Sequence, residues 1–134
     1  MELLSFTLNK TLFGILLDRV KEIVRETRVT PVPLTPEYIE GVMNLRGEPI
    51  SIIDLKKRLG FEKKSESIDI ILCYIKDSIV GLRVDKIQNI HKYSPEDFKE
   101  VSSGLKEDIE SKYVKGIVHI KENKYLIIDV DKLI

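Results

Sequence analysis

Residues 38–57 read YIEGVMNLRGEPISIIDLKK, and residues 113–132 read YVKGIVHIKENKYLIIDVDK. The two segments align without gaps. Each begins with Tyr, has Gly at its fourth position and carries an Ile-Ile-Asp run near its end. In each, two apolar runs flank a short polar stretch, which is the pattern of a β-hairpin. We therefore predict that the same hairpin occurs twice in the chain.

A second pair of segments repeats in the same order, because residues 2–25 align without gaps on residues 69–92. Short apolar strands resemble one another by chance, but in both pairs a Gly and an Asp coincide. The halves 1–60 and 68–134 are therefore predicted to form two similar β units, with strands open to exchange between them. Each unit is too small to bury much surface alone, so we expect a single domain over residues 1–134 with a shared hydrophobic interface.

The composition also favours a sheet. The 134 residues include 19 Ile, 11 Val and 15 Leu but no Ala, and β-branched residues favour strands whereas Ala favours helices. The 22 basic residues equal the 22 acidic ones, which argues against nucleic-acid binding because that rests on phosphate neutralisation. No apolar run approaches the roughly 18 residues that span a bilayer. No basic segment precedes an apolar one at the start of the chain, so we expect a cytosolic protein.

The remaining elements follow from local patterns. The segment 19–26 fits either a helical stripe or a bent strand, and three prolines make residues 29–36 an extended connection. The other predicted elements are strands at 2–8 and 11–17, a helix start at Thr35-Pro36, a helix 55–59 between an Asp54 cap and Gly60, a hairpin of 68–76 with 79–91, a helical turn at 94–97 and a hairpin of 113–121 with 124–130.

Residues with catalytic or metal-binding chemistry are scarce. His91 and His119 lack metal-ligand spacing and are expected at strand surfaces. Cys73 lies in an apolar run, which predicts an inert core thiol. Asp54 and Asp129 occupy matching positions, but an aspartate after a strand and before a helix is better explained as a helix cap. We therefore expect no enzyme, and predict no catalytic residue, no metal site and no cofactor.

One polar stretch differs between the repeats. Asn44-Leu45-Arg46-Gly47 occurs only in the first hairpin, where Asn and Gly suit a tight turn that projects Arg46. On composition alone, the plainer interpretation is a solvated arginine at a hairpin end.

With its flanking residues, this stretch resembles the signature of the CheW family of bacterial chemotaxis coupling proteins. The resemblance covers nearly the whole chain in order. Its motifs are Pro33, residues 38–47, residues 49–60, Val80-Gly81-Leu82-Arg83-Val84-Asp85-Lys86-Ile87, residues 113–117 and residues 126–130.

The resemblance implies an all-β protein with two SH3-like five-stranded β-barrels, a shared hydrophobic core and a few short helices. It also implies a non-catalytic adaptor, monomeric when free, that links the cytoplasmic tip of methyl-accepting chemotaxis receptors to the regulatory domain of the histidine kinase CheA. Such an adaptor is cytoplasmic, associates with membrane receptor arrays through its partners, inserts into no membrane and binds no nucleic acid.

The resemblance further assigns candidate binding residues. The kinase-binding face corresponds to Leu4, Leu17, Val20 and Ile23, although some of these could simply fill the barrel core. The receptor groove between the barrels corresponds to Gly41, Asn44, Leu45, Arg46 and Gly47, together with Glu22. We hypothesise that Glu22 and Arg46 form an ion pair that fixes the hairpin end against the neighbouring strand.

Two alternatives to this function stay open at this point. One is a CheW-like scaffold of a chemotaxis-like pathway that does not control motility. The other is a small β-barrel module for nucleic acid or a ligand, which needs a basic face with interleaved aromatics. Aromatic residues make up only 7% of the chain and Trp is absent, which disfavours the second alternative.

Overall fold

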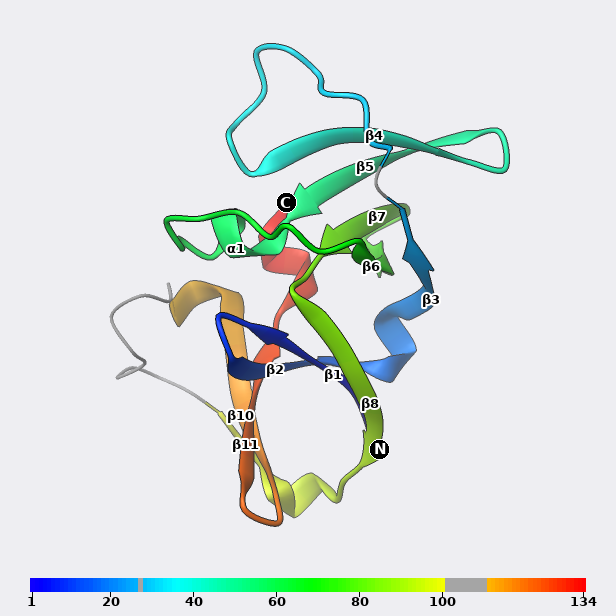
Figure 1. The fold of residues 1–134 in the computed structure, drawn as a ribbon. Coiled ribbons are helices and arrows are strands. Elements are labelled where there is room, and N and C mark those ends of the chain that lie inside the picture. Colours follow the sequence, from blue (N-terminus) through cyan, green and yellow to red (C-terminus); the bar gives the residue numbers. More distant parts are fainter. Residues whose placement is uncertain (27, 101–110) are drawn as a thin grey trace.

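The strands form two sheets, which lie one above the other in Figure 1 with α1 (Leu55–Arg58) and the C-terminal end of the chain between them. The computed structural model describes residues 1–26, 28–100 and 111–134. The six-stranded sheet contains, in spatial order, β8 (Lys86–Lys92), β1 (Glu2–Leu8), β2 (Thr11–Leu16), β11 (Asn123–Ile128), β10 (Val114–Ile120) and β9 (Phe98–Glu100). The five-stranded sheet contains β3 (Val20–Arg25), β6 (Asp69–Ile75), β7 (Ser78–Arg83), β5 (Glu48–Asp54) and β4 (Ile39–Leu45). Short 3₁₀ helices connect them: η1 (Leu17–Arg19), η2 (Pro95–Asp97), η3 (Ser111–Tyr113) and η4 (Val130–Leu133).

Neither sheet is built from one half of the sequence. The N-terminal strand β2 pairs in parallel with β11, and β5 pairs in parallel with β7. The two parallel pairs share one register, in which Gly14 lies opposite Ile127 and Gly81 lies opposite Ile52. A Cβ atom on Gly81 would lie 2.5 Å from the Ile52 side chain, so the glycine makes room for the isoleucine. The parallel pairing within each sheet therefore joins the two halves of the chain.

Three hydrophobic clusters explain this arrangement. The largest lies between the sheets, and both contribute to it: Phe6 and Phe13 come from one, Ile53 and Ile71 from the other. Each sheet also curls around a smaller cluster of its own. Alternate residues of one strand pack in different clusters, because successive side chains point to opposite faces. The predicted all-β fold with two SH3-like barrels and a shared core is confirmed, and the six-stranded sheet corrects the expected five strands.

The sequence did not reveal every element correctly. No helix begins at Thr35, whose hydroxyl instead donates to the Val32 carbonyl (2.8 Å) and closes a turn. The predicted long strand 79–91 is also wrong, because the chain leaves one sheet after β7 and enters the other at β8. At that crossing the Asp85 carboxylate accepts hydrogen bonds from the Asn9 amide and the Ser65 hydroxyl. The ambiguous segment 19–26 contains a strand, β3.

The two aspartates predicted as helix caps behave differently. Asp54 is buried and accepts a hydrogen bond from the Lys57 amide (3.2 Å), as predicted, and Gly60 follows the helix with a φ of 98°. Burial raises the pKa of the Asp54 carboxyl. Asp129 precedes η4 without a side-chain capping bond, so the prediction is wrong there.

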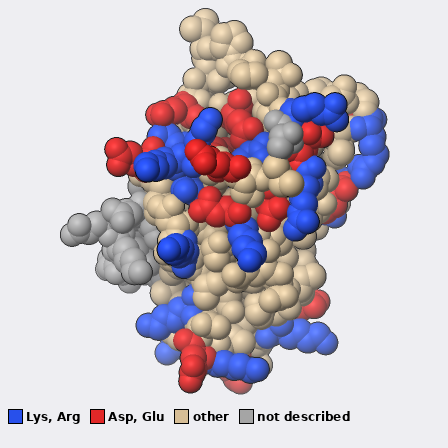
Figure 2. All heavy atoms as spheres, viewed as in Figure 1, with Lys and Arg blue, Asp and Glu red and all other residues tan. Residues whose placement is uncertain are grey.

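Charged side chains of both signs lie intermixed on the face seen in Figure 2. They gather in a band across the middle of that face, and neither sign forms a separate patch. Among the described residues, no helix is long and apolar enough to cross a membrane.

The burial of Leu4 gives a first testable prediction. Leu4 is 2% exposed within the shared core, whereas Ile23 is 44% exposed. We expect Leu4→Ala to lower the free energy of unfolding by about 2–5 kcal/mol, the usual range for a buried leucine. Ile23→Ala should lower it by less than about 1 kcal/mol, because little apolar area is lost from the interior. Urea unfolding measures both values, and equal losses would contradict the assignment of Leu4 to the core.

Candidate functional site

The turn between β4 and β5 projects Arg46 from the end of the first hairpin. Arg46 and Gly47 both have positive φ angles, 49° and 87°, as a two-residue hairpin turn of type I′ requires. The Asn44 side-chain oxygen accepts a hydrogen bond from the Gly47 amide (3.0 Å). Asn44 and Gly47 therefore shape the turn, and Arg46 is the member of the stretch whose side chain reaches out of it.

Arg46 forms a two-point ion pair with Glu22 of β3. Its Nη1 and Nη2 atoms donate to Oε1 and Oε2 of Glu22 at 3.1 and 2.9 Å, and Lys21 Nζ lies 3.1 Å from Oε1. The hydrogen bonds from Arg46, and secondarily from Lys21, lower the pKa of Glu22 to about 2. The hypothesised ion pair is confirmed.

The position of this ion pair in the sheet gives it a structural role. The strands β3 and β4 are the two edges of the five-stranded sheet. Glu22 lies opposite Leu72, which packs in the cluster inside this sheet. Glu22 therefore sits on the concave side at the rim, where it meets Arg46 from the turn beyond the opposite edge. The pair links the two ends of the curled sheet and closes the barrel.

Gly41 has a packing role. Its φ is 150°, and an added Cβ would lie 2.1 Å from the Thr30 carbonyl oxygen. Thr30 forms two backbone hydrogen bonds with Val42, of 2.9 and 2.8 Å. Only glycine lets the backbone at Thr30 pass so close beside β4. The receptor-groove role of Gly41 stays a prediction, as does that of Leu45, which packs at the edge of the cluster inside the five-stranded sheet.

A bulge in β3 brings two candidate residues to one face. The register against β6 shifts at Lys21, so Val20 lies opposite Cys73 and Ile23 lies opposite Ile71. Directly opposed side chains share a face, and both partners belong to the core between the sheets. Without the extra residue, Val20 and Ile23 would point to opposite faces.

The apolar row formed by Leu17, Val20 and Ile23 therefore runs along η1 and β3. Leu17 and Val20 are half-buried against the shared core, and Ile23 is exposed. Leu4 lies in the core itself and does not reach the surface. The kinase-binding role of these residues stays a prediction.

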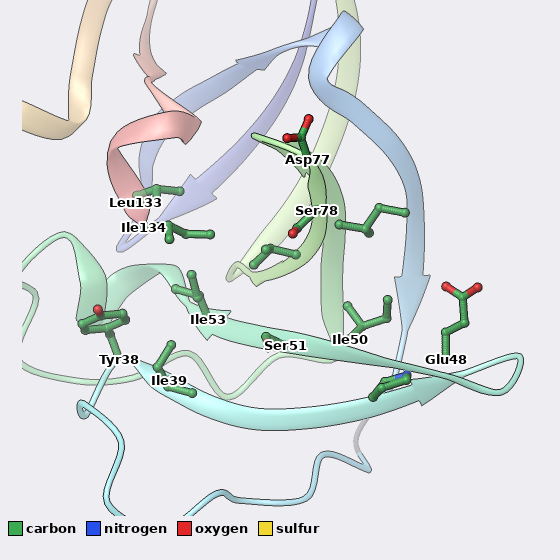
Figure 3. A pocket seen from close by; sticks show the side chains of 13 residues that line it. Tyr38, Ile39, Glu48, Ile50, Ser51, Ile53, Asp77, Ser78, Leu133 and Ile134 are labelled. Atoms are coloured by element: carbon green, nitrogen blue, oxygen red, sulfur yellow. The ribbon is translucent and has the colours of Figure 1, made fainter.

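A hollow of about 650 Å³ lies beside the first hairpin (Figure 3). Its walls come from β5, from the start of β7 and from the C-terminal end of the chain, with the acidic side chains of Glu48 and Asp77 among them. Its other lining residues are mostly apolar: Tyr38, Ile39, Pro49, Ile50, Ser51, Ile53, Ser78, Ile79, Val80, Leu133 and Ile134. None of the six predicted groove residues lines this hollow, so it is a separate feature.

The arrangement offers surfaces for contact and little for chemistry. Cys73 is buried, as predicted, and burial raises its pKa to about 12. His91 is half-buried and within 3.0 Å of the Ser5 hydroxyl, so it is more enclosed than expected. Among the described residues, no three His, Cys, Asp or Glu side chains gather as a metal site would require.

Sequence reasoning missed two arginines that hold the fold together. Arg83 is 4% exposed and forms a two-point ion pair with Glu40, at 2.6 and 2.8 Å. It also donates to the carbonyls of Glu26 and Ser67. Arg58 lies between two tyrosine rings. The position of Arg83 in a mostly apolar strand was a sequence feature from which its role could have been predicted. The residues around Arg58 in the sequence offered no such feature.

Comparison with known proteins matches this architecture. A family model of the CheW-like domain matches residues 2–134. The chain belongs to this family. The Chemotaxis protein CheW of Treponema pallidum is 34% identical to it over 98% of this chain and 81% of that protein. The Chemotaxis protein CheW of Thermotoga maritima is 32% identical over 99% and 87%.

A solved structure agrees with the fold throughout. The crystal structure of the scaffolding protein TtCheW from Thermoanaerobacter tengcongensis has a TM-score of 0.91 to this chain at 32% identity. The match covers 98% of this chain and 90% of that one. The family model and the solved structure therefore agree on a CheW-type fold for this chain.

The Glu22–Arg46 ion pair gives a prediction on pH. We expect Arg46→Ala to raise the pKa of Glu22 from about 2 towards its usual 4.5, with a smaller rise for Lys21→Ala. Because the folded-state pKa lies below the usual one, the pair stabilises the fold at pH above about 4.5, and this stability is lost as the pH falls towards 2. NMR titration of the Glu22 side-chain carboxyl carbon measures the shift. An unchanged pKa in the folded Arg46→Ala variant would show that another group holds the carboxylate charged.

Proposed function

We propose that the chain is a non-catalytic adaptor that couples methyl-accepting chemoreceptors to the histidine kinase CheA by holding both at once. The observation that carries this proposal is the combination of a CheW-type fold with an apolar row along η1 and β3 and a charged hairpin end that is paired to the same strand β3. An adaptor couples two partners only if its contacts differ in energy between two arrangements of those partners. Its binding surfaces must therefore keep a fixed position relative to each other.

The kinase-binding surface is the apolar row of Leu17, Val20 and Ile23. Ile23 is a large apolar side chain exposed in a strand that also carries Lys21, Glu22 and Arg25. Such side chains mark partner sites when they adjoin further apolar area. Half-buried Leu17 and Val20 supply that area. A few anchors of this kind provide most of the affinity of an interface.

The receptor site is the first hairpin end with Glu22, where the tip of the receptor's helical hairpin docks. The Arg46 side chain stays 66% exposed while it is paired with Glu22, so it remains accessible to a partner. The turn is held in place by the Asn44–Gly47 bond and by the ion pair. Little conformational entropy is lost when a partner binds a surface that is already rigid.

The two proposed surfaces adjoin, because Glu22 lies between Val20 and Ile23 in the same strand. The bulge at Lys21 separates them by turning Glu22 to one face and its two apolar neighbours to the other. A single strand can therefore offer a charged face to one partner and an apolar face to a second.

The family also admits a scaffold in a pathway that does not control motility, and the residues named above would serve it equally. The composition disfavours the module for nucleic acid, because such binding needs a basic face and the 22 basic residues are balanced by 22 acidic ones. On the face seen in Figure 2 the two signs lie intermixed. Retention on heparin or single-stranded DNA at low salt would favour that module.

A binding measurement with the isolated regulatory domain of CheA tests the kinase surface. We expect Ile23→Glu and Val20→Glu to weaken binding by at least about tenfold, because an unpaired carboxylate is then buried in an apolar contact. Ile90→Glu is the matched control, since Ile90 is another exposed isoleucine, in β8 of the other sheet, and should bind normally. Circular dichroism verifies that the variants fold.

Three results would count against the proposal. Unchanged kinase binding by the folded Ile23→Glu and Val20→Glu variants would remove the apolar row from the kinase surface. Loss of receptor binding with intact kinase binding in the same variants would assign the row to the receptor. Failure of the unmodified chain to bind either partner would overturn the adaptor function.

Arg46→Ala tests the receptor surface in an array reconstituted from receptor, kinase and this chain. We expect the receptor-controlled kinase activity to fall while kinase binding in isolation and the fold persist, because the hairpin end loses its anchor. Arg25→Ala is the control, since Arg25 is an exposed arginine in β3, the strand of Glu22, and pairs with Asp69 of β6 instead. A normal response of the array with Arg46→Ala would exclude this role.

A further inference from the structure

The side chain of Arg58 contacts both sheets at once. Its Cζ atom lies 4.1 Å from the centre of the Tyr38 ring and 4.9 Å from the centre of the Tyr113 ring. Tyr38 directly precedes β4 of the five-stranded sheet, and Tyr113 directly precedes β10 of the six-stranded sheet. One guanidinium therefore bridges two rings that belong to different barrels.

A hydrogen bond adds a third attachment. Arg58 Nε donates to the backbone carbonyl of Leu133 at 2.8 Å, and Leu133 belongs to η4, which follows the six-stranded sheet. The alignment that matches Tyr38 with Tyr113 also matches Arg58 with Leu133. The contact thus lies where equivalent parts of the two halves face each other.

Both tyrosines are anchored to their own sheets in the same way. The carbonyl of Tyr38 accepts a hydrogen bond from the Asp54 amide, and that of Tyr113 accepts one from the Asp129 amide, each at 2.8 Å. These bonds tie each tyrosine backbone to the end of the neighbouring strand. The two rings consequently follow the sheets to which they belong.

The core between the sheets holds the two sheets together, but it fixes the rotation of one sheet relative to the other less well than a directional contact does. Burial of apolar surface is non-directional, so aliphatic side chains tolerate small sliding movements. A guanidinium contact is directional, because the planar group stacks on ring faces and its N–H bonds point along fixed axes. A rotation of one sheet against the other would break the stack or the bond to Leu133.

We propose that Arg58 is a positioning residue that fixes the relative orientation of the two barrels. If the chain is the adaptor proposed above, this fixed orientation transmits receptor movement to the kinase. Arg58 touches neither proposed binding surface and acts through the geometry that it imposes on them.

Residual dipolar couplings of the backbone amides test the orientation directly. In the unmodified chain, one alignment tensor should fit both sheets. In Arg58→Ala each sheet should still fit a tensor of its own, but the two tensors should differ in orientation or magnitude. Lys57→Ala is the matched control, because it removes a positive charge from the same helix. Lys57 contacts the Glu37 carboxylate and the Glu62 carbonyl, neither of which belongs to the six-stranded sheet.

Arg58→Lys serves as a second variant that retains the charge and the aliphatic stem. It lacks the planar group that stacks on both rings, so it should show the same change to a smaller degree, and it supplies the test if Arg58→Ala does not fold. A single tensor with unchanged orientation in a folded Arg58 variant, or the same change in Lys57→Ala, would overturn the positioning role.

The reconstituted array separates this inference from the adaptor function. With Arg58→Ala, the separate affinities for receptor and kinase should stay within about twofold of the unmodified chain, while receptor control of kinase activity declines. If the receptor still controlled kinase activity normally although the orientation of the barrels had changed, the transmitting role would be contradicted. If the unmodified chain bound neither partner, the adaptor function would fail, yet the dipolar couplings would still decide the orientation.

Discussion

The packing of two small curled sheets against each other is the interaction on which the whole molecule depends. Each sheet encloses only a small cluster of its own, and most of the largest buried side chains belong to the cluster between them. Neither barrel holds enough apolar surface to offset the entropy of ordering its chain. The shared core therefore makes two barrels into one cooperative unit.

Within this common plan the barrels differ at their rims. The first is closed by the ion pair of Glu22 and Arg46. The matching positions of the second hold Asn89 and Lys121, and an uncharged amide cannot form the same pair. There the Ser5 hydroxyl bonds to the backbone amide and carbonyl of Asn89. One rim thus carries a charged, exposed ion pair that the matching positions of the other cannot form, which makes the first hairpin end the candidate for recognition.

Local pattern was sufficient for the hairpins, for the Asp54 cap and for the all-β class, because these depend on neighbours in the sequence. The Glu22–Arg46 pair came from the family resemblance. Features that depend on distant contacts escaped prediction: the bulge at Lys21 is defined by pairing with β6, and the break after β7 by the second sheet. Burial of Leu4 and the stack on Arg58 likewise depend on how two sheets meet, which no single segment encodes.

The interleaving of the strands also has a consequence for synthesis on the ribosome. The strands β1 and β2 emerge first, but their partners β8 and β11 lie in the second half of the chain. The strands β1 and β2 must wait, with unpaired outer edges and apolar faces, until β8 and β11 have been made. Such non-local pairing slows folding and leaves the nascent chain prone to aggregation.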